Sequence, residues 1–311
     1  MAEAVALAAL VLDAAWGWPA WLYRRIGHPV GAFARIIALC ERRWNLPTYS
    51  ECRRRTAGVA TLLLLVLAGG GAGWAIQWLA HAALGPAGWI VVALCAFPGL
   101  AQHSLYCHVR AVAGPLAVGD LPAARRAVGM IVGRDTATLD DAGIARAALE
   151  SLAESFCDGV AAPLFWLLVG GLPGLWAYKA VNTADSLIGH PEPPLRAFGW
   201  AAARTDDCVN WLPARIAGVL LCCAGGGGWR IMARDHACHA SPNGGWPEAA
   251  MAGALRVRLA GPVSYDGVAH DKPWIGDGAA PDARAVRTGL WIYARACLML
   301  WMIAGGCAWL V

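Results

Sequence analysis

Residues 58–80 read GVATLLLLVLAGGGAGWAIQWLA, and this stretch decides the fold class. Its only strongly polar side chain is that of Gln77. In a helix that rises about 1.5 Å per residue it would extend roughly 34 Å, and the hydrocarbon core of a bilayer is about 30 Å thick. The sequence therefore predicts a membrane-spanning helix here.

The composition of the whole chain agrees with a membrane setting. Of its 311 residues, 58% are apolar and 15% are charged, whereas charged residues make up about 25% of a usual soluble domain. The mean hydropathy is +0.48. These values exclude a disordered chain and a small disulfide scaffold, and the eleven cysteines show no metal-type spacing.

We expect an all-α, polytopic protein with one integral-membrane domain over residues 1–311. Five to six hydrophobic spans are predicted, and the candidates are residues 4–22, 58–80, 86–102, 160–178, 211–228 and 289–311. The stretch 160–178 is interrupted by Pro163 and by glycine and proline at 170–174. We favour a re-entrant hairpin there, because a full crossing would separate the polar groups on its two sides.

The segments between the spans are expected to differ in structure and in function. Residues 28–55 predict an amphipathic helix at the cytoplasmic membrane surface, and eight arginines lie between positions 24 and 55. The positive-inside rule explains this cluster better than nucleic acid does, so we expect no nucleic-acid partner. Residues 103–159 and 179–208 are predicted to be polar active-site segments, and residues 229–288 a long structured loop.

Three carboxylates, those of Glu150, Glu154 and Asp158, follow one another at intervals of four residues. On a helix they share one face, where their charges repel one another unless a cation neutralises them. A bound Mg²⁺ would remove this repulsion, which makes the three residues candidate Mg²⁺ ligands. The spacing alone slightly favours a solvated acidic face in which Glu150 pairs with Arg146.

Further polar side chains flank the next two spans. Lys179, Asn182 and Asp185 lie on one side of a helix after the interrupted stretch. Arg215 lies within an apolar segment and needs a partner, for which Asp206 and Asp207 are the nearest candidates. Structural roles, such as a snorkelling lysine or a structural ion pair, are open for each.

Other motifs are weak or absent. His236 and His239 suggest a metal site only faintly, because no third ligand is obvious. Residues 249–255 predict a helix of small residues, and the spacing alone favours Glu248 as a simple acid in its first turn. The chain has no P-loop, no GxSxG and no HExxH sequence.

Several short motifs together resemble one family. They are Gly27-His28-Pro29-Val30, Val132-Gly133-Arg134-Asp135-Thr136, residues 147–154, residues 158–165, Tyr178-Lys179-Ala180-Val181-Asn182-Thr183-Ala184-Asp185-Ser186, residues 206–215 and residues 241–249. In this order, over about residues 20–265, they resemble the CobD/CbiB family of cobalamin biosynthesis, the adenosylcobinamide-phosphate synthases. Phe156-Cys157 and the loop up to Asp282 depart from the family pattern.

The resemblance implies an ATP- and Mg²⁺-dependent ligase in the cell (inner) membrane, with its active site on the cytoplasmic side. It would join adenosylcobyric acid to (R)-1-aminopropan-2-ol phosphate, or to the free amino alcohol. Its partners would be these substrates and the lipid bilayer, with other membrane enzymes of cobamide assembly as further candidates.

The resemblance also suggests roles for single residues. The catalytic candidates are Glu154, Asp158, Lys179, Asp185, Asp207 and Glu248. The candidates for binding substrate or ATP are His28, Arg134, Asp135, Asn182, Asn210, Arg215, Asn243 and Trp246. Within these sets, Arg134 and Lys179 would contact phosphate oxygens, and Asp185, Asp207 or Glu248 would accept the proton of the amine.

Three other functions fit the sequence less well. A polytopic transporter would be expected to show inverted repeats, and none is visible. A membrane prenyltransferase would need two aspartate-rich motifs, which Asp140-Asp141 and Asp206-Asp207 match only in part. A corrinoid-binding scaffold without catalysis would not need the acidic residues together with Lys179.

Overall fold

The computed structural model describes residues 2–265 and 268–310. Helices account for 77% of the residues, and the strands are only two or three residues long, so the all-α prediction is confirmed. Contacts between Cα atoms divide the chain into two compact units. Unit 1 comprises residues 1–101, 162–210 and 304–311, and unit 2 comprises residues 102–161 and 211–303.

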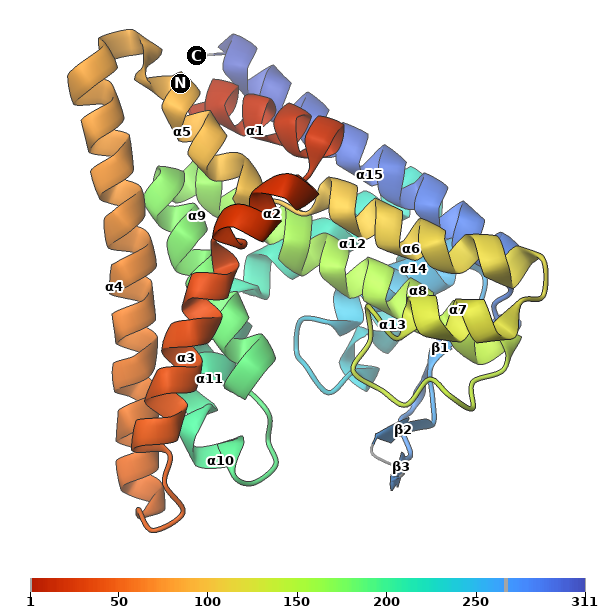
Figure 1. Ribbon diagram of the computed structural model, residues 1–311. Coiled ribbons are helices and arrows are strands. Elements are labelled where there is room, and N and C mark those ends of the chain that lie inside the picture. The colour runs from red at the N-terminus through yellow and green to blue at the C-terminus, as the bar shows by residue number, and fades with distance from the viewer. Residues whose placement is uncertain (1, 266–267, 311) are drawn as a thin grey trace. The chain divides into compact units, whose positions relative to one another are not determined.

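Unit 1 is built around two long helices, α4 (Glu51–Leu84) and α9 (Ala162–Ile188). Its other helices are α1 (Ala2–Trp16), α2 (Ala20–Ile26), α3 (Val30–Trp44), η1 (Gly85–Ala87), α5 (Gly88–Ala96), η2 (Phe97–Gly99), α10 (Leu195–Phe198) and α11 (Trp200–Val209). Figure 1 shows α3 and α4 lying beside each other. Phe33 and Ile37 bury one face of α3, as the amphipathic pattern predicted.

Glycines on α4 allow a close approach to its neighbours. A Cβ atom on Gly73 would lie 2.7 Å from the carbonyl oxygen of Leu172, and one on Gly69 would lie 2.7 Å from that of Trp176. No real Cβ atom tolerates such contacts. Small residues at helix interfaces are typical of membrane proteins, because association there depends on close van der Waals packing.

Helix α9 is broken where the sequence predicted an interruption. Gly171 has φ 60° and ψ −156°, which divides α9 into two helical parts. The backbone N–H of Leu172, freed by this break, donates to the side-chain oxygen of Gln77 at 3.0 Å. The single strongly polar side chain of residues 58–80 therefore satisfies the broken backbone. The re-entrant placement of this segment in a bilayer stays a prediction.

The helices are long and apolar enough for a membrane protein. Three helical stretches meet the length and composition of a span, namely Glu51–Ala117, Asp141–Ile188 and Ala283–Gly306. The number is up to five if each of two bent helix pairs counts as one span, against the five to six predicted. Leu67 on α4 is 72% exposed, and Trp74 stacks on Trp78 with both rings exposed. Such an apolar surface suits lipid.

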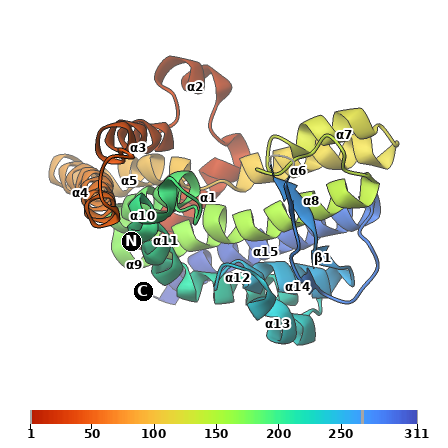
Figure 2. The ribbon, with the colours of Figure 1, turned by 90° about the horizontal axis from the view of Figure 1, so that it is seen from below.

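Unit 2 is arranged around α8 (Asp141–Phe156). Helices α6 (Gln102–Ala117) and α7 (Leu121–Val128) pack on one side of α8, and α14 (Gly245–Leu255) packs on another (Figures 1 and 2). Helix α15 (Ala283–Leu310) also contacts α8, since Gly289 lies against Leu149 and Tyr293 lies against Phe156. A short π-helix, η3 (Cys157–Ala161), follows α8 directly.

Residues 229–288 are more regular than the predicted long loop. They contain α13 (Trp229–Asp235), the 3₁₀ turn η4 (His236–Cys238) and α14, which packs on α12 (Trp211–Gly225) and on α13. Two small antiparallel ladders follow, β1 (Leu259–Ala260) with β4 (Trp274–Ile275) and β2 (Val263–Tyr265) with β3 (Val268–His270). The helix expected at residues 249–255 is part of α14. The sequence carried no such signal for α13, because the glycines before it weaken the helical pattern.

An ion-pair clamp holds the end of α13 to the segment after β4. Both carboxylate oxygens of Asp235 accept hydrogen bonds from Arg234, and Oδ2 also accepts from the backbone N–H of Gly276 at 2.8 Å. Arg234 extends to Asp277 at 2.8 Å. The hydrogen bonds from Arg234 lower the pKa of Asp235, and they outweigh the opposing effect of burial.

The close approach of α4 and α9 can be tested with two glycines of the same helix. We expect Gly73→Ala to lower the free energy of unfolding by about 1–3 kcal/mol, because the new methyl group meets the backbone of Leu172. Gly71→Ala meets nothing within 4 Å and should be neutral or stabilising. Thermal unfolding in detergent measures both, and equal melting temperatures would contradict the packing described.

The clamp predicts a pH-dependent stability. The pKa of Asp235 is lower in the folded chain than in the unfolded one, so its contribution is complete at neutral pH and is lost as the pH falls through the folded value. We expect Asp235→Asn to destabilise by about 1–3 kcal/mol at pH 7, and the difference from wild type to shrink below about pH 4.

Asp277→Asn is the matched control for this experiment. The Asp277 side chain is 69% exposed, so its removal should cost less than about 1 kcal/mol. Chemical unfolding at a series of pH values measures these differences. A constant difference between wild type and Asp235→Asn from pH 7 to pH 3 would refute the role of the ionised carboxylate.

Candidate functional site

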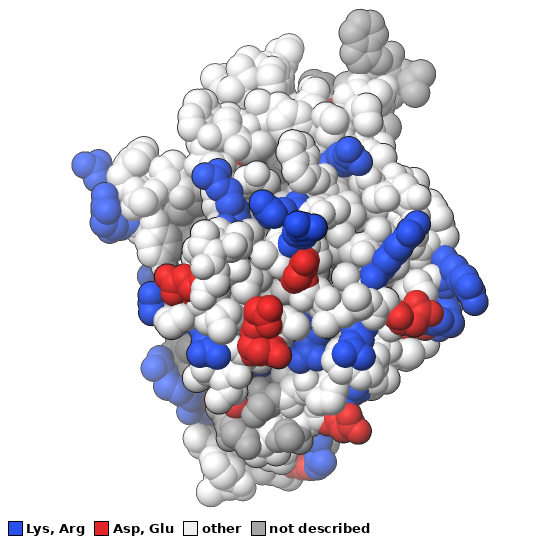
Figure 3. Space-filling view, turned by 90° about the vertical axis from the view of Figure 1, so that its right-hand side faces the viewer, with Lys and Arg blue, Asp and Glu red and all other residues white. Residues whose placement is uncertain are grey.

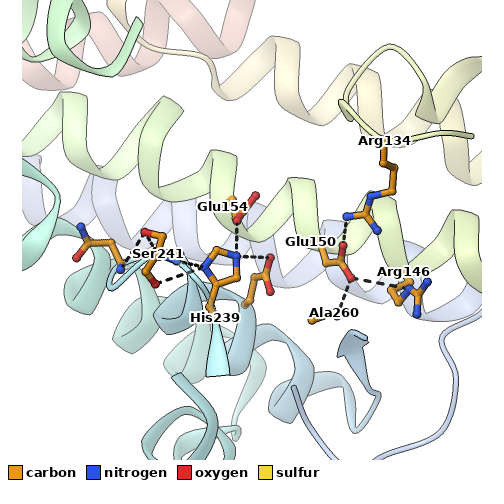
Figure 4. Close-up of polar contacts among 10 residues, drawn as sticks. Arg134, Arg146, Glu150, Glu154, His239, Ser241 and Ala260 are labelled. Atoms are coloured by element: carbon orange, nitrogen blue, oxygen red, sulfur yellow. Dashed lines mark hydrogen bonds and ion pairs between the residues drawn. The ribbon is translucent and has the colours of Figure 1, made fainter. Parts of the chain in front are cut away.

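Three side chains from separate parts of unit 2 meet at one point. Glu154 comes from α8, His239 follows η4, and Glu248 lies in the first turn of α14. His239 Nε2 lies 3.2 Å from Glu154 Oε1 and 3.8 Å from Glu248 Oε1. Figure 4 shows the imidazole ring between the two carboxyl groups. We call this group the Glu–His–Glu cluster.

The cluster is largely shielded from solvent. The side chain of Glu248 is 4% exposed and that of His239 is 19% exposed, whereas Glu154 is 43% exposed. Burial raises the pKa of Glu248 well above its usual range, and the negative charge of Glu154 raises it further. Burial opposes protonation of His239, but the hydrogen bond and the charge of Glu154 outweigh it and raise the pKa of His239.

A tight turn fixes the orientation of His239. The backbone N–H of Ser241 donates to His239 Nδ1 at 3.1 Å, and Ser241 Oγ accepts from the N–H groups of Asn243 and Gly244. A Cβ atom on Gly244 would lie 2.7 Å from the imidazole ring. Glycine is therefore needed at this position to leave room for the ring, which explains part of the motif at 241–249.

The geometry of the cluster suits a divalent cation. One ligand atom from each of the three residues lies within 4.8 Å of the other two. Glu248 Oε2 is buried and has no hydrogen-bond partner among residues 2–265 and 268–310. A buried carboxylate oxygen without a partner is costly, and a cation would satisfy it. Two carboxylates and one imidazole can alternatively pass a proton between them.

Glu150 has a different role from the one predicted. Its carboxylate accepts a hydrogen bond from Arg134 and another from the backbone N–H of Ala260 at 2.7 Å, and Arg146 lies 4.0 Å away (Figure 4). The structure therefore agrees better with the alternative prediction, in which Glu150 forms an ion pair with Arg146. Arg134, a predicted phosphate contact, here contacts a carboxylate.

Asp158 is absent from the Glu–His–Glu cluster among the described residues. It lies in the π-helix η3, two residues beyond the end of α8. Its role as a Mg²⁺ ligand stays a prediction. Asp135 lies in the turn-rich segment between α7 and α8.

Arg215, Asn243 and Trp246, three predicted binding residues, do meet in unit 2. Arg215 donates to Asn243 Oδ1 at 3.1 Å, and its guanidinium carbon lies 4.8 Å from the centre of the Trp246 ring. Trp246 also lies against His236, with 4.1 Å between the ring centres. The partners of Arg215 are thus an amide and aromatic rings. Asp207, one of its predicted partners, pairs with Arg204 instead.

Unit 1 contains a second polar group, formed by α9 and the end of α11. Lys179 donates to Asn182 at 3.3 Å, Tyr178 donates to Asn210 at 3.0 Å, and Asn210 donates to Asp206 at 2.9 Å. The negative charges of Asp206 and Asp207 act on Asp185. The positive charge of Lys179 acts on His28. The predicted residues His28, Lys179, Asn182, Asp185, Asp207 and Asn210 all belong to this group.

Sequence reasoning missed His239 as a main participant. The pair His236 and His239 was visible, but the two carboxylates that approach His239 are 85 residues before it and nine residues after it, so no local spacing could connect them. Asp206 was expected as a candidate partner of Arg215, but it accepts from Asn210 instead. Tyr178 gave no separate signal.

Comparisons with known proteins agree with the motifs. A family model described as CobD/Cbib protein matches residues 6–293. A relative named "Cobalamin biosynthesis protein CobD" from Rhodobacter capsulatus is 48% identical over 311 residues, covering 97% of this chain and 96% of the relative. Proteins of the same name from Sinorhizobium sp (46% identical, 94% of each chain covered) and Geobacter metallireducens (44%, with 97% of this chain and 96% of the relative covered) are also similar.

No solved structure matches the chain. The family model nevertheless spans nearly the whole sequence, and these relatives are covered almost from end to end. The chain therefore belongs to the CobD/Cbib protein family.

Proposed function

We propose that this chain is a membrane-bound, ATP-dependent acid–amine ligase of cobalamin biosynthesis. It would join adenosylcobyric acid to (R)-1-aminopropan-2-ol phosphate, or to the free amino alcohol, and form adenosylcobinamide phosphate or adenosylcobinamide. The observation that carries the proposal is the Glu–His–Glu cluster with its buried Glu248, in a family whose curated relatives are named for cobalamin biosynthesis.

The reaction sets clear chemical demands. A carboxylate is a poor acyl donor, so ATP has to activate the acid by phosphorylation. The neutral amine then attacks the activated carbonyl carbon, the amide bond forms, phosphate leaves and the amine loses a proton. The protein has to balance the phosphate charge and hold the reactants in line.

The Glu–His–Glu cluster fits the divalent cation that such a ligase needs. Mg²⁺ prefers oxygen ligands and usually binds one or two carboxylates together with substrate phosphates. Glu154 and Glu248 would therefore hold Mg²⁺, which would neutralise charge on the phosphates of ATP. This assignment replaces Glu150 and Asp158 by Glu248, because the unpartnered oxygen belongs to Glu248 and Arg134 already contacts Glu150.

His239 would orient the metal-binding carboxylate of Glu154. Its Nε2 lies 3.2 Å from that carboxylate, and its Nδ1 is held by the turn at Ser241. Groups that hold a metal ligand in place often affect binding strongly. Lys179, Asp185 and Asp207 belong to the separate polar group of unit 1. Their expected roles, contact with phosphate oxygens for Lys179 and acceptance of the amine proton for Asp185 or Asp207, stay predictions.

The helices described above also fit the proposed location. We propose a multi-pass protein of the cell membrane with its reactive groups on the cytoplasmic side, where ATP is available. The arginines at the start of α4 support this orientation, since cytoplasmic ends of spans are rich in arginine and lysine. A corrinoid-binding scaffold without catalysis would not need two carboxylates beside one imidazole.

The proposal predicts the effect of removing single charges. We expect Glu154→Gln and Glu248→Gln to lower the rate of ligation by about 100-fold or more, because each removes a negative ligand of the cation. Lys179→Met should also lower the rate. The measurement is product formation by the full chain in detergent with adenosylcobyric acid, the amino alcohol phosphate, ATP and Mg²⁺.

Glu51→Gln is the matched control, because the Glu51 side chain is 71% exposed and pairs only with surface arginine. Its rate should stay within about twofold of wild type. Consumption of ATP should require both substrates together. Intact ligation in both Glu154→Gln and Lys179→Met, or ATP use that ignores the substrates, would disprove the proposed function.

A further inference from the structure

A small cavity of unit 2 lies apart from the Glu–His–Glu cluster. It has a volume of about 260 Å³, and its walls include Asp140, Gly143, Arg146, Arg258, Trp274 and Pro281. We call it the Trp274 pocket. Arg146 and Glu154 are eight residues apart on α8, which corresponds to roughly 12 Å along a helix axis. The pocket is therefore a separate feature, and none of its residues has a role in the proposed reaction.

Two guanidinium groups meet at one indole ring in this pocket. The guanidinium carbon of Arg146 lies 5.1 Å from the centre of the Trp274 ring, and that of Arg258 lies 4.7 Å from it. The two positive charges are thus within about 10 Å of each other, a separation at which salt screens their repulsion only in part. Stacking on the ring keeps both side chains in place.

The negative charges nearby do not balance these arginines. In the described part of the chain, no carboxylate forms an ion pair with Arg258. Arg146 lies 4.0 Å from Glu150, but Glu150 also accepts a hydrogen bond from Arg134. Asp140 caps α8 by accepting from the N–H of Gly143 at 2.7 Å, and its negative charge also acts on Arg146. Three arginines, Arg134, Arg146 and Arg258, are therefore set against two carboxylates, those of Glu150 and Asp140. An anion entering the pocket would therefore meet positive charge that the nearby carboxylates do not fully neutralise.

Arg146 has two further contacts beside the pocket. Its Nη2 donates to the carbonyl of Pro262 at 3.1 Å, and its Nε faces Oε1 of Glu150 at 4.0 Å, beyond hydrogen-bond distance. Figure 3 shows basic and acidic side chains interspersed on one face of the molecule.

We propose that the Trp274 pocket binds the phosphate group of a small ligand between Arg146 and Arg258. Guanidinium groups match phosphate oxygens in pairs, and a phosphate monoester carries about 1.5–2 negative charges at neutral pH, which suits two arginines better than one carboxylate does. The volume is below the roughly 300 Å³ at which drug-sized ligand sites begin, so the pocket takes a compact group.

The phosphate can come from a soluble ester or from a lipid headgroup. Tryptophan and arginine are both common at the membrane interface, and Trp274 is 40% exposed. A soluble monoester carries about 1.5–2 negative charges and a headgroup diester carries one, but both present phosphate oxygens to the two guanidinium groups. The site does not depend on the proposed ligase activity, because it is defined by binding alone.

The test measures binding of inorganic phosphate to the full chain in nanodiscs of neutral phosphatidylcholine. We expect Arg258→Gln to raise the dissociation constant for phosphate by about tenfold or more, because one charge-assisted contact is lost. Arg146→Lys keeps the charge but loses the paired geometry, and it should also weaken binding. The matched control is Arg256→Gln, which removes an exposed arginine two residues from Arg258 and should change the constant by less than twofold.

A second arm separates the two sources. Nanodiscs that contain phosphatidylglycerol should compete with phosphate in the wild type, but not in Arg258→Gln, if the natural ligand is a lipid headgroup. Equal phosphate binding in both kinds of nanodisc assigns the pocket to a soluble phosphate ester. Equal binding by wild type and Arg258→Gln, an equal loss in Arg256→Gln, or no binding at millimolar phosphate would overturn the proposal.

Discussion

The structure depends on how carboxylates buried in an apolar chain are compensated. Helix α8 carries two carboxylates one turn apart, those of Glu150 and Glu154, and their surroundings differ. Glu150 is neutralised by arginine and by a backbone N–H group, so it joins α8 to the loop before it and to β1. Glu154 meets an imidazole and a second acid. Because the first charge is satisfied internally and the second cluster keeps an unpartnered oxygen, only the second is suited to an external cation.

Close backbone packing supplies the framework for these groups. Glycines of α4 let the backbone of α9 approach, and Gln77 repairs the hydrogen bond that the break at Gly171 opens. The part of α9 after this break carries Tyr178, Lys179, Asn182 and Asp185. A polar group can lie on a broken helix in an apolar setting only if the broken backbone is itself satisfied. The glycines and Gln77 are therefore as important to unit 1 as the charged residues are.

Local patterns predicted much of this protein correctly. Hydropathy indicated long apolar helices, the run at 170–174 indicated a break, and ordered motifs indicated a family that the comparisons confirm. Of the predicted set of Glu150, Glu154 and Asp158, Glu150 contacts Arg134, and Glu154 meets His239 and Glu248 instead. The helix expected at residues 249–255 is part of α14, whereas α13 gave no clear signal, because the glycines before it weaken the helical pattern.

The amino-acid sequence by itself determined the class of fold, the family and the stretch of α8 that carries the acidic residues. These features depend on composition and on intervals of a few residues, which a single helix makes visible. Only the tertiary structure decided that His239 and Glu248 join Glu154, and that two distant arginines share the ring of Trp274. Contacts between residues far apart in the chain depend on how the helices pack, and no local periodicity records that packing.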